Sequence, residues 1–202
     1  AERRLYSYAA LEGDLLEKRA IAIHASYYGV SAGEAPTQAA LHDYYGSQYN
    51  RDSSRLAALH LIYRAFAAGV YLTDWHFYGS AQAEEELGRR YRAWLEDPAL
   101  GKERLERAAQ AEHMRWNYFM YTRGWRQAGL AQLAAYLDLG NPRQQLELAR
   151  LHPYLCSWEM LSENWERVSR MVHDHNPQKN LPDPRDYDRE SVRSTPDFLA
   201  PG

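Results

Sequence analysis

Two short motifs carry the residues best suited to ligand chemistry, and each places a histidine three residues before an aromatic side chain. The first runs from His24 to Tyr27 and the second from His113 to Trp116. Two aromatic rings that face each other across a cleft form a slot for a flat heterocycle, and stacking of a base on such a ring contributes on the order of 1 to 3 kcal/mol. Tyr27 and Trp116 are therefore the candidate stacking residues.

Polar residues near these motifs could bind the rest of such a ligand. His24, His113 and Glu112 could hydrogen-bond the edge of a heterocycle. The candidate phosphate-binding cations are Arg51, Arg115, Arg126 and Arg189, and their neighbours Asn50 and Trp125 complete the ligand-binding set. The alternative interpretation also stands: the histidines and tryptophans belong to the core, and Arg51 and Arg189 anchor loops to carboxylates.

One long helix must position the second motif. Apolar residues recur at spacings near three and four from Leu105 onward, without a proline or glycine before Gly124. This pattern predicts a helix over about residues 101–123, with Gly124 suited to its C-terminal cap. Glu112, His113 and Trp116 then lie at neighbouring positions on a face that should otherwise be apolar.

Helical periodicity continues through most of the chain. A helix is predicted over about 14–29, and another runs from Asp52 or Ser53 to about Ala68. Residues 70–80 lack a helical period, which predicts an extended or irregular loop. A short helix is predicted over 143–151 and a surface loop over 174–186. A short final helix is predicted over 188–199. The larger side chains of the helix ending at Ala68 are expected to face inward: Leu56, Leu59, His60, Tyr63 and Phe66.

A weak internal repeat indicates that the chain contains two related halves. The His24 and His113 motifs echo each other, and residues 48–55 echo residues 186–193 in the same order. We therefore expect a mainly α fold in which two pseudo-symmetric helical repeats pack as one domain, with short extended or strand segments. The expected division is an N-terminal arm over 1–13, a first repeat over 14–100 and a second over 101–199.

Composition restricts the classes of partner. The 202 residues carry a net charge of −3 and no block of five lysines and arginines, so wrapping of nucleic acid is not expected. No apolar run reaches the length of a membrane span, so membrane insertion is not expected. A single cysteine, Cys156, allows neither an internal disulfide nor a cysteine-based zinc site, which favours a cytoplasmic protein.

Other chemistries have weaker support. The pair in His173–His175 could chelate a metal, and His42-Asp43 with His24 and Asp74 loosely resembles the His/Asp metal phosphohydrolases. Cys156 after His152 suggests a cysteine nucleophile, although such a cysteine is more often packed in a core. Without a Gly-rich phosphate loop or a nucleophile-elbow motif, we expect no enzyme activity, no cofactor and no metal.

Four stretches together resemble the ryanodine-receptor repeat, or RyR domain. They are Glu112-His113-x-Arg115-Trp116, Gly124–Arg126, Leu151–Leu161 and Tyr187–Arg193. Ala22–His24 and Tyr49–Ser53 look like the degenerate partner repeat that precedes it in bacterial members, so the resemblance covers most of residues 14–199.

This resemblance implies a non-catalytic sensor of a nucleotide-derived ligand, covalently linked to or associated with an effector domain, as in predicted bacterial defence proteins. It implies that an adenine ring stacks between the aromatics of the His24–Tyr27 and His113–Trp116 motifs. The chain departs from the family pattern where Tyr27 replaces the usual tryptophan, where Met120 replaces an arginine, and in the length of residues 127–151. The alternatives are a protein–protein interaction module that uses the same groove and, less favoured, a metal-dependent phosphohydrolase. Assembly into a homo-oligomer is open.

Overall fold

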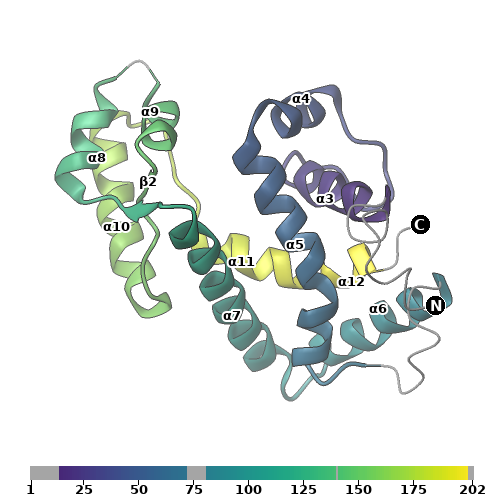
Figure 1. The fold of residues 1–202 in the computed structure, drawn as a ribbon. Coiled ribbons are helices and arrows are strands. Elements are labelled where there is room, and N and C mark those ends of the chain that lie inside the picture. The colour runs from purple at the N-terminus through teal and green to yellow at the C-terminus, as the bar shows by residue number, and fades with distance from the viewer. Residues whose placement is uncertain (1–13, 72–80, 140, 200–202) are drawn as a thin grey trace. The chain divides into compact units, whose positions relative to one another are not determined.

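The computed structural model describes residues 14–71, 81–139 and 141–199 (Figure 1). Helices make up 72% of the described residues and strands 2%, which confirms the expected mainly α fold. The arm over 1–13 and most of the predicted extended loop over 70–80 lie outside the described residues. No helix in the described ranges combines the length and the apolar character that a membrane span requires.

The chain divides into two compact units, and the first joins the residues up to Arg104 with those from Arg193 onward. Its helices are α3 (Asp14–Ser26), α4 (Gln38–Gly46), α5 (Gln48–Ala67), α6 (Ala81–Leu95) and α12 (Thr195–Leu199). Helix α5 packs on α3 and α4, and α12 packs on α6 and α5. Large side chains that are almost completely buried form the centre of the unit: Tyr44, Leu61, Leu87, Tyr91 and Leu199.

Local sequence signals explain where several of these helices begin and end. The Thr37 hydroxyl accepts the Ala40 amide at 3.2 Å at the start of α4, and the Ser47 hydroxyl accepts the Asn50 amide at 3.2 Å at the start of α5. Helix α3 ends at Ser26, three residues before the end of the predicted helix over 14–29, because residues 27–29 form a turn.

Buried polar contacts fix α12 in the first unit. Arg64 Nη1 donates to Thr195 Oγ1 at 2.6 Å, and both side chains are buried. Arg19 Nη2 lies 2.6 Å from a Glu84 carboxylate oxygen and donates to the Leu199 carbonyl at 3.2 Å. These contacts join α3, α5 and α6 to the short C-terminal helix, so residues at the end of the sequence complete a core that begins near residue 19.

The predicted inward face of α5 was wrong for three of its five residues. Leu59, Tyr63 and Phe66 are exposed, whereas the side chains that face the core are mostly small: Ala57, Ala58, Leu61 and Ala65. The alanines let the helix backbone approach its neighbours closely, and the large residues are left on the opposite side.

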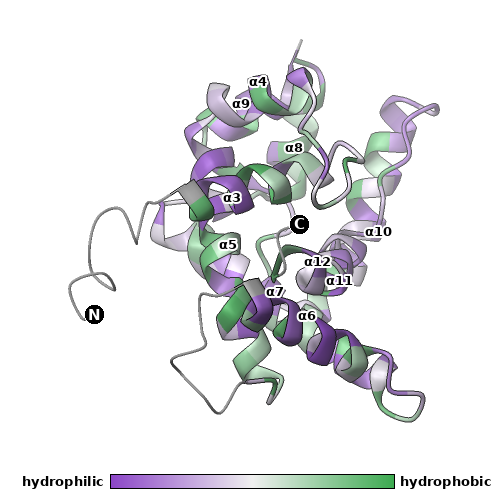
Figure 2. Cartoon of the chain, turned by 90° about the vertical axis from the view of Figure 1, so that its right-hand side faces the viewer, coloured by the Kyte–Doolittle hydropathy of each residue, from purple (hydrophilic) through white to green (hydrophobic). Residues whose placement is uncertain are grey.

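The second unit comprises Leu105–Val192. It contains most of α7 (Gly101–Thr122), followed by β1 (Arg126–Gln127), α8 (Leu130–Leu137), α9 (Pro142–Leu148), β2 (Leu151–His152), α10 (Trp158–His175) and α11 (Pro184–Arg193). The two short strands are parallel, with Arg126 opposite Leu151 and Gln127 opposite His152. One cluster of buried core residues here comprises Ala128, Leu133, Leu151, Val168 and Val172. Figure 2 shows hydrophilic and hydrophobic residues alternating along α10, as expected of a helix with one face on this core.

Helix α7 agrees with the predicted helix over 101–123 to within one residue. It ends where Gly124 adopts a φ of 78°, a left-handed conformation that glycine tolerates best. The C-terminal prediction was wrong in detail, because α10 continues to His175 and α11 already begins at Pro184 rather than at 188. A proline fits the first turn of a helix, where its missing N–H has no helical partner. The short helix predicted over 143–151 ends at Leu148, and β2 follows it.

Candidate functional site

His113 lies at the centre of a buried polar network in the second unit. It is 2% exposed on α7. Its Nδ1 lies 3.1 Å from the Asp188 Oδ2 on α11, and its Nε2 lies 2.9 Å from the Cys156 carbonyl oxygen. Asn117, one turn later on α7, donates its Nδ2 to the same carbonyl at 2.8 Å. The network therefore connects α7, α11 and the segment before α10.

Both ring nitrogens of His113 face oxygen atoms, and this arrangement requires a proton between His113 and Asp188. Nε2 must carry a hydrogen because a carbonyl can only accept. A second proton must then lie on Nδ1 or on the Asp188 carboxyl, or two lone pairs would face each other at 3.1 Å. Burial raises the pKa of Asp188, while the hydrogen bond from His113 and its charge act in the opposite direction. His113 is thus held in place by two partners.

Trp116 is the half-buried aromatic residue next to this network. Its ring meets the His152 ring edge-on, with the centroids 4.7 Å apart and the planes at 74°, and it lies 5.8 Å from the His113 ring. Burial, followed by the charge of nearby His113, lowers the pKa of His152 to about 4. His152 is therefore neutral at pH 7, and Trp116 packs edge-to-face with an uncharged imidazole ring.

Glu112 and Arg115 form a bidentate ion pair beside Trp116. The guanidinium Nε and Nη2 each lie 2.7 Å from a Glu112 carboxylate oxygen, and the side chains of Arg115 and Glu112 are 12% and 5% exposed. Such parallel hydrogen bonds hold a guanidinium in one orientation. A ligand anion that bound Arg115 would have to share it with Glu112.

The remaining candidates of the second unit are Trp125, Arg126 and Arg189. Trp125 is buried, and Arg126 is exposed on β1. Arg189 donates two hydrogen bonds to Glu106, at 2.7 and 3.0 Å, and one to Asp186 at 2.8 Å. It therefore joins α11 to α7, and a phosphate at Arg189 would have to displace carboxylates. This geometry is what the loop-anchoring alternative predicts for Arg189.

In the first unit, His24 is surrounded by tyrosines. Its ring lies 5.5 Å from Tyr44, 5.7 Å from Tyr28 and 6.5 Å from Tyr27, between centroids. His24 is buried, with Nε2 3.4 Å from an Asp43 carboxylate oxygen. Tyr27, in contrast, is 61% exposed, so one face of this aromatic cluster is open to solvent.

Two further candidates of the first unit bind backbone carbonyls. Asn50 is buried and donates its Nδ2 to the Asp43 carbonyl at 3.2 Å. Arg51 donates through Nη1 to the Tyr45 carbonyl. Tyr27 belongs to the first unit and Trp116 to the second, and a slot between them stays a prediction.

Sequence reasoning did not select Asp188, Asn117 or His152 as members of the site. Asn117 follows Trp116 directly, and Asp188 lies next to the selected Arg189, so both were adjacent to sequence signals. His152 was considered only as a partner of a Cys156 nucleophile. Burial raises the pKa of the Cys156 thiol, which disfavours the reactive thiolate.

The metal-site alternatives are weak in the described part of the chain. Within residues 14–71, 81–139 and 141–199, no group of three His, Cys, Asp or Glu side chains is positioned to hold a metal ion. His175 lies 3.7 Å from Asp138 as an exposed pair. Asp74, named with His42-Asp43 and His24 in the phosphohydrolase hypothesis, lies outside the described residues.

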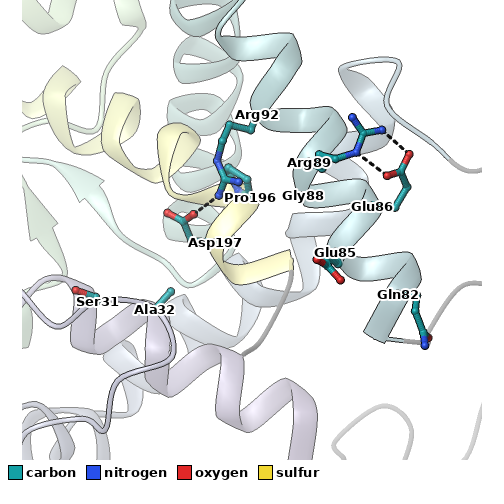
Figure 3. A pocket seen from close by; sticks show the side chains of 10 residues that line it. All are labelled: Ser31, Ala32, Gln82, Glu85, Glu86, Gly88, Arg89, Arg92, Pro196 and Asp197. Atoms are coloured by element: carbon teal, nitrogen blue, oxygen red, sulfur yellow. Dashed lines mark hydrogen bonds and ion pairs between the residues drawn. The ribbon is translucent and has the colours of Figure 1, made fainter.

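A pocket of about 580 Å³ lies in the first unit, and none of the predicted ligand-binding residues lines it (Figure 3). Charged residues of both signs line it, and its arginines are paired: Arg89 with Glu86 and Arg92 with Asp197, each at 2.7 Å. Because both guanidinium groups already bind carboxylates, the pocket offers no preformed anion site.

Comparison with protein-family models gives no match, and comparisons with curated proteins and with solved structures likewise give no significant match.

Proposed function

We propose that this chain is a non-catalytic regulatory domain that binds a nucleotide or a nucleotide-derived signal, with Trp116 as its principal stacking surface. The observation that carries this proposal is the half-buried Trp116 ring, fixed by the neutral His152 edge and adjacent to the buried His113 network. An aromatic ring held in one orientation loses little conformational entropy when a base stacks on it.

The surrounding side chains have distinct roles in this proposal. Both nitrogens of His113 are used internally, so His113 positions the helix rather than reading the ligand. Arg115 lies next to the stacking surface with its guanidinium oriented by Glu112, and the charged end of a nucleotide would have to share it with that carboxylate. The exposed Tyr27 of the first unit is the proposed opposite ring, and a linked or associated effector domain would carry the output.

A thermal-shift screen against adenine and guanine nucleotides, ADP-ribose and cyclic nucleotides tests the proposal. A ligand at 100 times its dissociation constant stabilises the folded state by about 2.7 kcal/mol. We expect one ligand class to raise the melting temperature of the parent and not of Trp116→Ala. Trp94→Ala is the matched control, because Trp94 is also a half-buried helical tryptophan and stacks under Arg104 at 5.5 Å in the first unit.

The control separates loss of binding from loss of packing. Both substitutions remove a half-buried indole, so both should lower the melting temperature of the free protein. Only Trp116→Ala should remove the ligand-induced shift. If no nucleotide shifts the parent, or if both variants keep the shift, Trp116 is not the stacking surface.

A protein–protein interaction module is the second candidate function, and one observation favours it. Met114, Tyr118 and Tyr121 lie on one side of α7, at spacings of four and three, and are 50%, 65% and 48% exposed. Exposed Met and Tyr residues are common at protein interfaces. This function predicts no nucleotide affinity and a loss of partner binding in Tyr118→Ala with an unchanged melting temperature.

A further inference from the structure

Helix α5 exposes an apolar surface to solvent along its C-terminal half. From Leu56 to Ala67 its exposed positions are all apolar, and the large ones are Leu59 (47%), Ile62 (41%), Tyr63 (68%) and Phe66 (66%). We call these four residues the α5 stripe. The charged residue of the same stretch, Arg64, is only 7% exposed and donates to Thr195. In a usual amphipathic helix the apolar side chains are buried and the charged ones are exposed, whereas here the large apolar side chains are exposed and the arginine is buried.

The stripe is large enough to matter for association. The Tyr71 ring lies 5.9 Å from the Phe66 ring and extends the stripe at its C-terminal end. Five side chains of this size, each about half exposed, present on the order of 500 Å². Two copies would bury about 1,000 Å² in total, which meets the minimum for a biological interface and corresponds to a weak, reversible dimer.

The spacing of the stripe is symmetric under reversal of the helix. Leu59, Ile62, Tyr63 and Phe66 are separated by three, one and three residues. In an antiparallel helix pair centred between residues 62 and 63, Leu59 faces Phe66 of the other copy and Ile62 faces Tyr63. Every contact then joins one aliphatic and one aromatic side chain, whereas a parallel pair would place like against like.

We infer that the α5 stripe is the interface of a two-fold symmetric dimer of this chain, in which two α5 helices pack antiparallel. A two-fold interface requires a surface that complements itself, and the aliphatic–aromatic pairing meets this requirement. The stripe carries no charge with which to select an oppositely charged partner. None of the proposed ligand-binding residues belongs to it, so the dimer and the proposed function are independent.

Two single substitutions and their mixture test this arrangement. Leu59→Glu and Phe66→Lys each place a charge against an apolar residue of the other copy. In sedimentation velocity over a range of protein concentrations, the parent should dimerise, and each variant alone should associate at least about tenfold more weakly. In an equimolar mixture, the new carboxylate of the Leu59→Glu chain would face the new ammonium group of the Phe66→Lys chain, so association should return. Leu148→Glu is the control, because Leu148 is 73% exposed on α9.

The outcomes are distinct. A parent that stays monomeric at all concentrations overturns the inference, as does a Leu148→Glu variant that weakens association as much as the stripe variants. Dimerisation that the stripe variants weaken but the mixture does not restore overturns the antiparallel pairing. Circular dichroism melting curves close to the parent establish that the variants are folded.

Discussion

Asp188 should hold His113 in place through the shared proton, and two substitutions at this position separate the effect of the hydrogen bond from the effect of the charge. His113 and Asp188 have side chains that are 2% and 14% exposed, with 3.1 Å between Nδ1 and Oδ2. Asp188→Ala leaves His113 Nδ1 buried without this partner. Asp188→Asn has nearly the same shape, and its amide can donate to Nδ1 while the neutral ring still donates from Nε2 to the Cys156 carbonyl.

The two substitutions should therefore lower the free energy of unfolding by different amounts. Removing one partner of a buried ion pair costs roughly 3 to 5 kcal/mol, and leaving a buried donor or acceptor without its partner costs roughly 1 to 3 kcal/mol. A neutral replacement that keeps the hydrogen bond should cost about 1 kcal/mol. We therefore expect Asp188→Ala to lower the free energy of unfolding of the second unit by about 3 kcal/mol and Asp188→Asn by about a third of that.

Urea unfolding followed by tryptophan fluorescence measures this effect in the relevant unit. Four of the six tryptophans lie within Leu105–Val192, at positions 116, 125, 158 and 165. Far-UV circular dichroism on the same samples reports both units, so a difference between the two transitions shows that they unfold separately. Equal losses in Asp188→Asn and Asp188→Ala would refute the shared-proton argument, and a loss below about 0.5 kcal/mol in Asp188→Ala would show that Asp188 does not hold His113.

Two further predictions concern packing and pH. In Gly88→Ala the new Cβ would lie 2.8 Å from the Pro196 carbonyl oxygen, so α12 must shift. A thermal melt should show a loss of stability of about 1 to 3 kcal/mol. Gly46→Ala is the control and should be close to neutral, because nothing lies within 4 Å of its Cβ. The pKa of His152 is about 4 in the folded state against an ordinary 6.5, so the stability that its neutral form contributes is present above pH 6.5 and is lost as the pH falls towards 4. Between pH 7 and pH 5 the parent should lose about 1 to 2 kcal/mol more than His152→Gln, and equal losses in urea titrations at the two pH values would contradict this assignment.

Local signals in the sequence predicted much of the secondary structure. An uninterrupted period near 3.6 defined α7 to within one residue, because neither proline nor glycine occurs between its first turn and Gly124. Gly124 marked the end of α7 through capping chemistry that depends only on neighbouring residues. The same periodicity placed Glu112, His113 and Trp116 on one side of α7. In the structure, His113 is the centre of the buried network, and Glu112 and Trp116 lie beside it.

Tertiary packing decided which faces are buried and which distant residues meet. Apolar residues occur on both sides of α5, so periodicity alone could not show that the alanines face the core and the α5 stripe faces solvent. His113 and Asp188 are 75 residues apart, and no local rule relates them. Their contact forms because α11 packs against α7 in the folded chain. The His113 ring is buried there, so each of its nitrogens needs an oxygen partner. The sequence alone determined most of the helices, and the burial of polar groups between helices determined the candidate site.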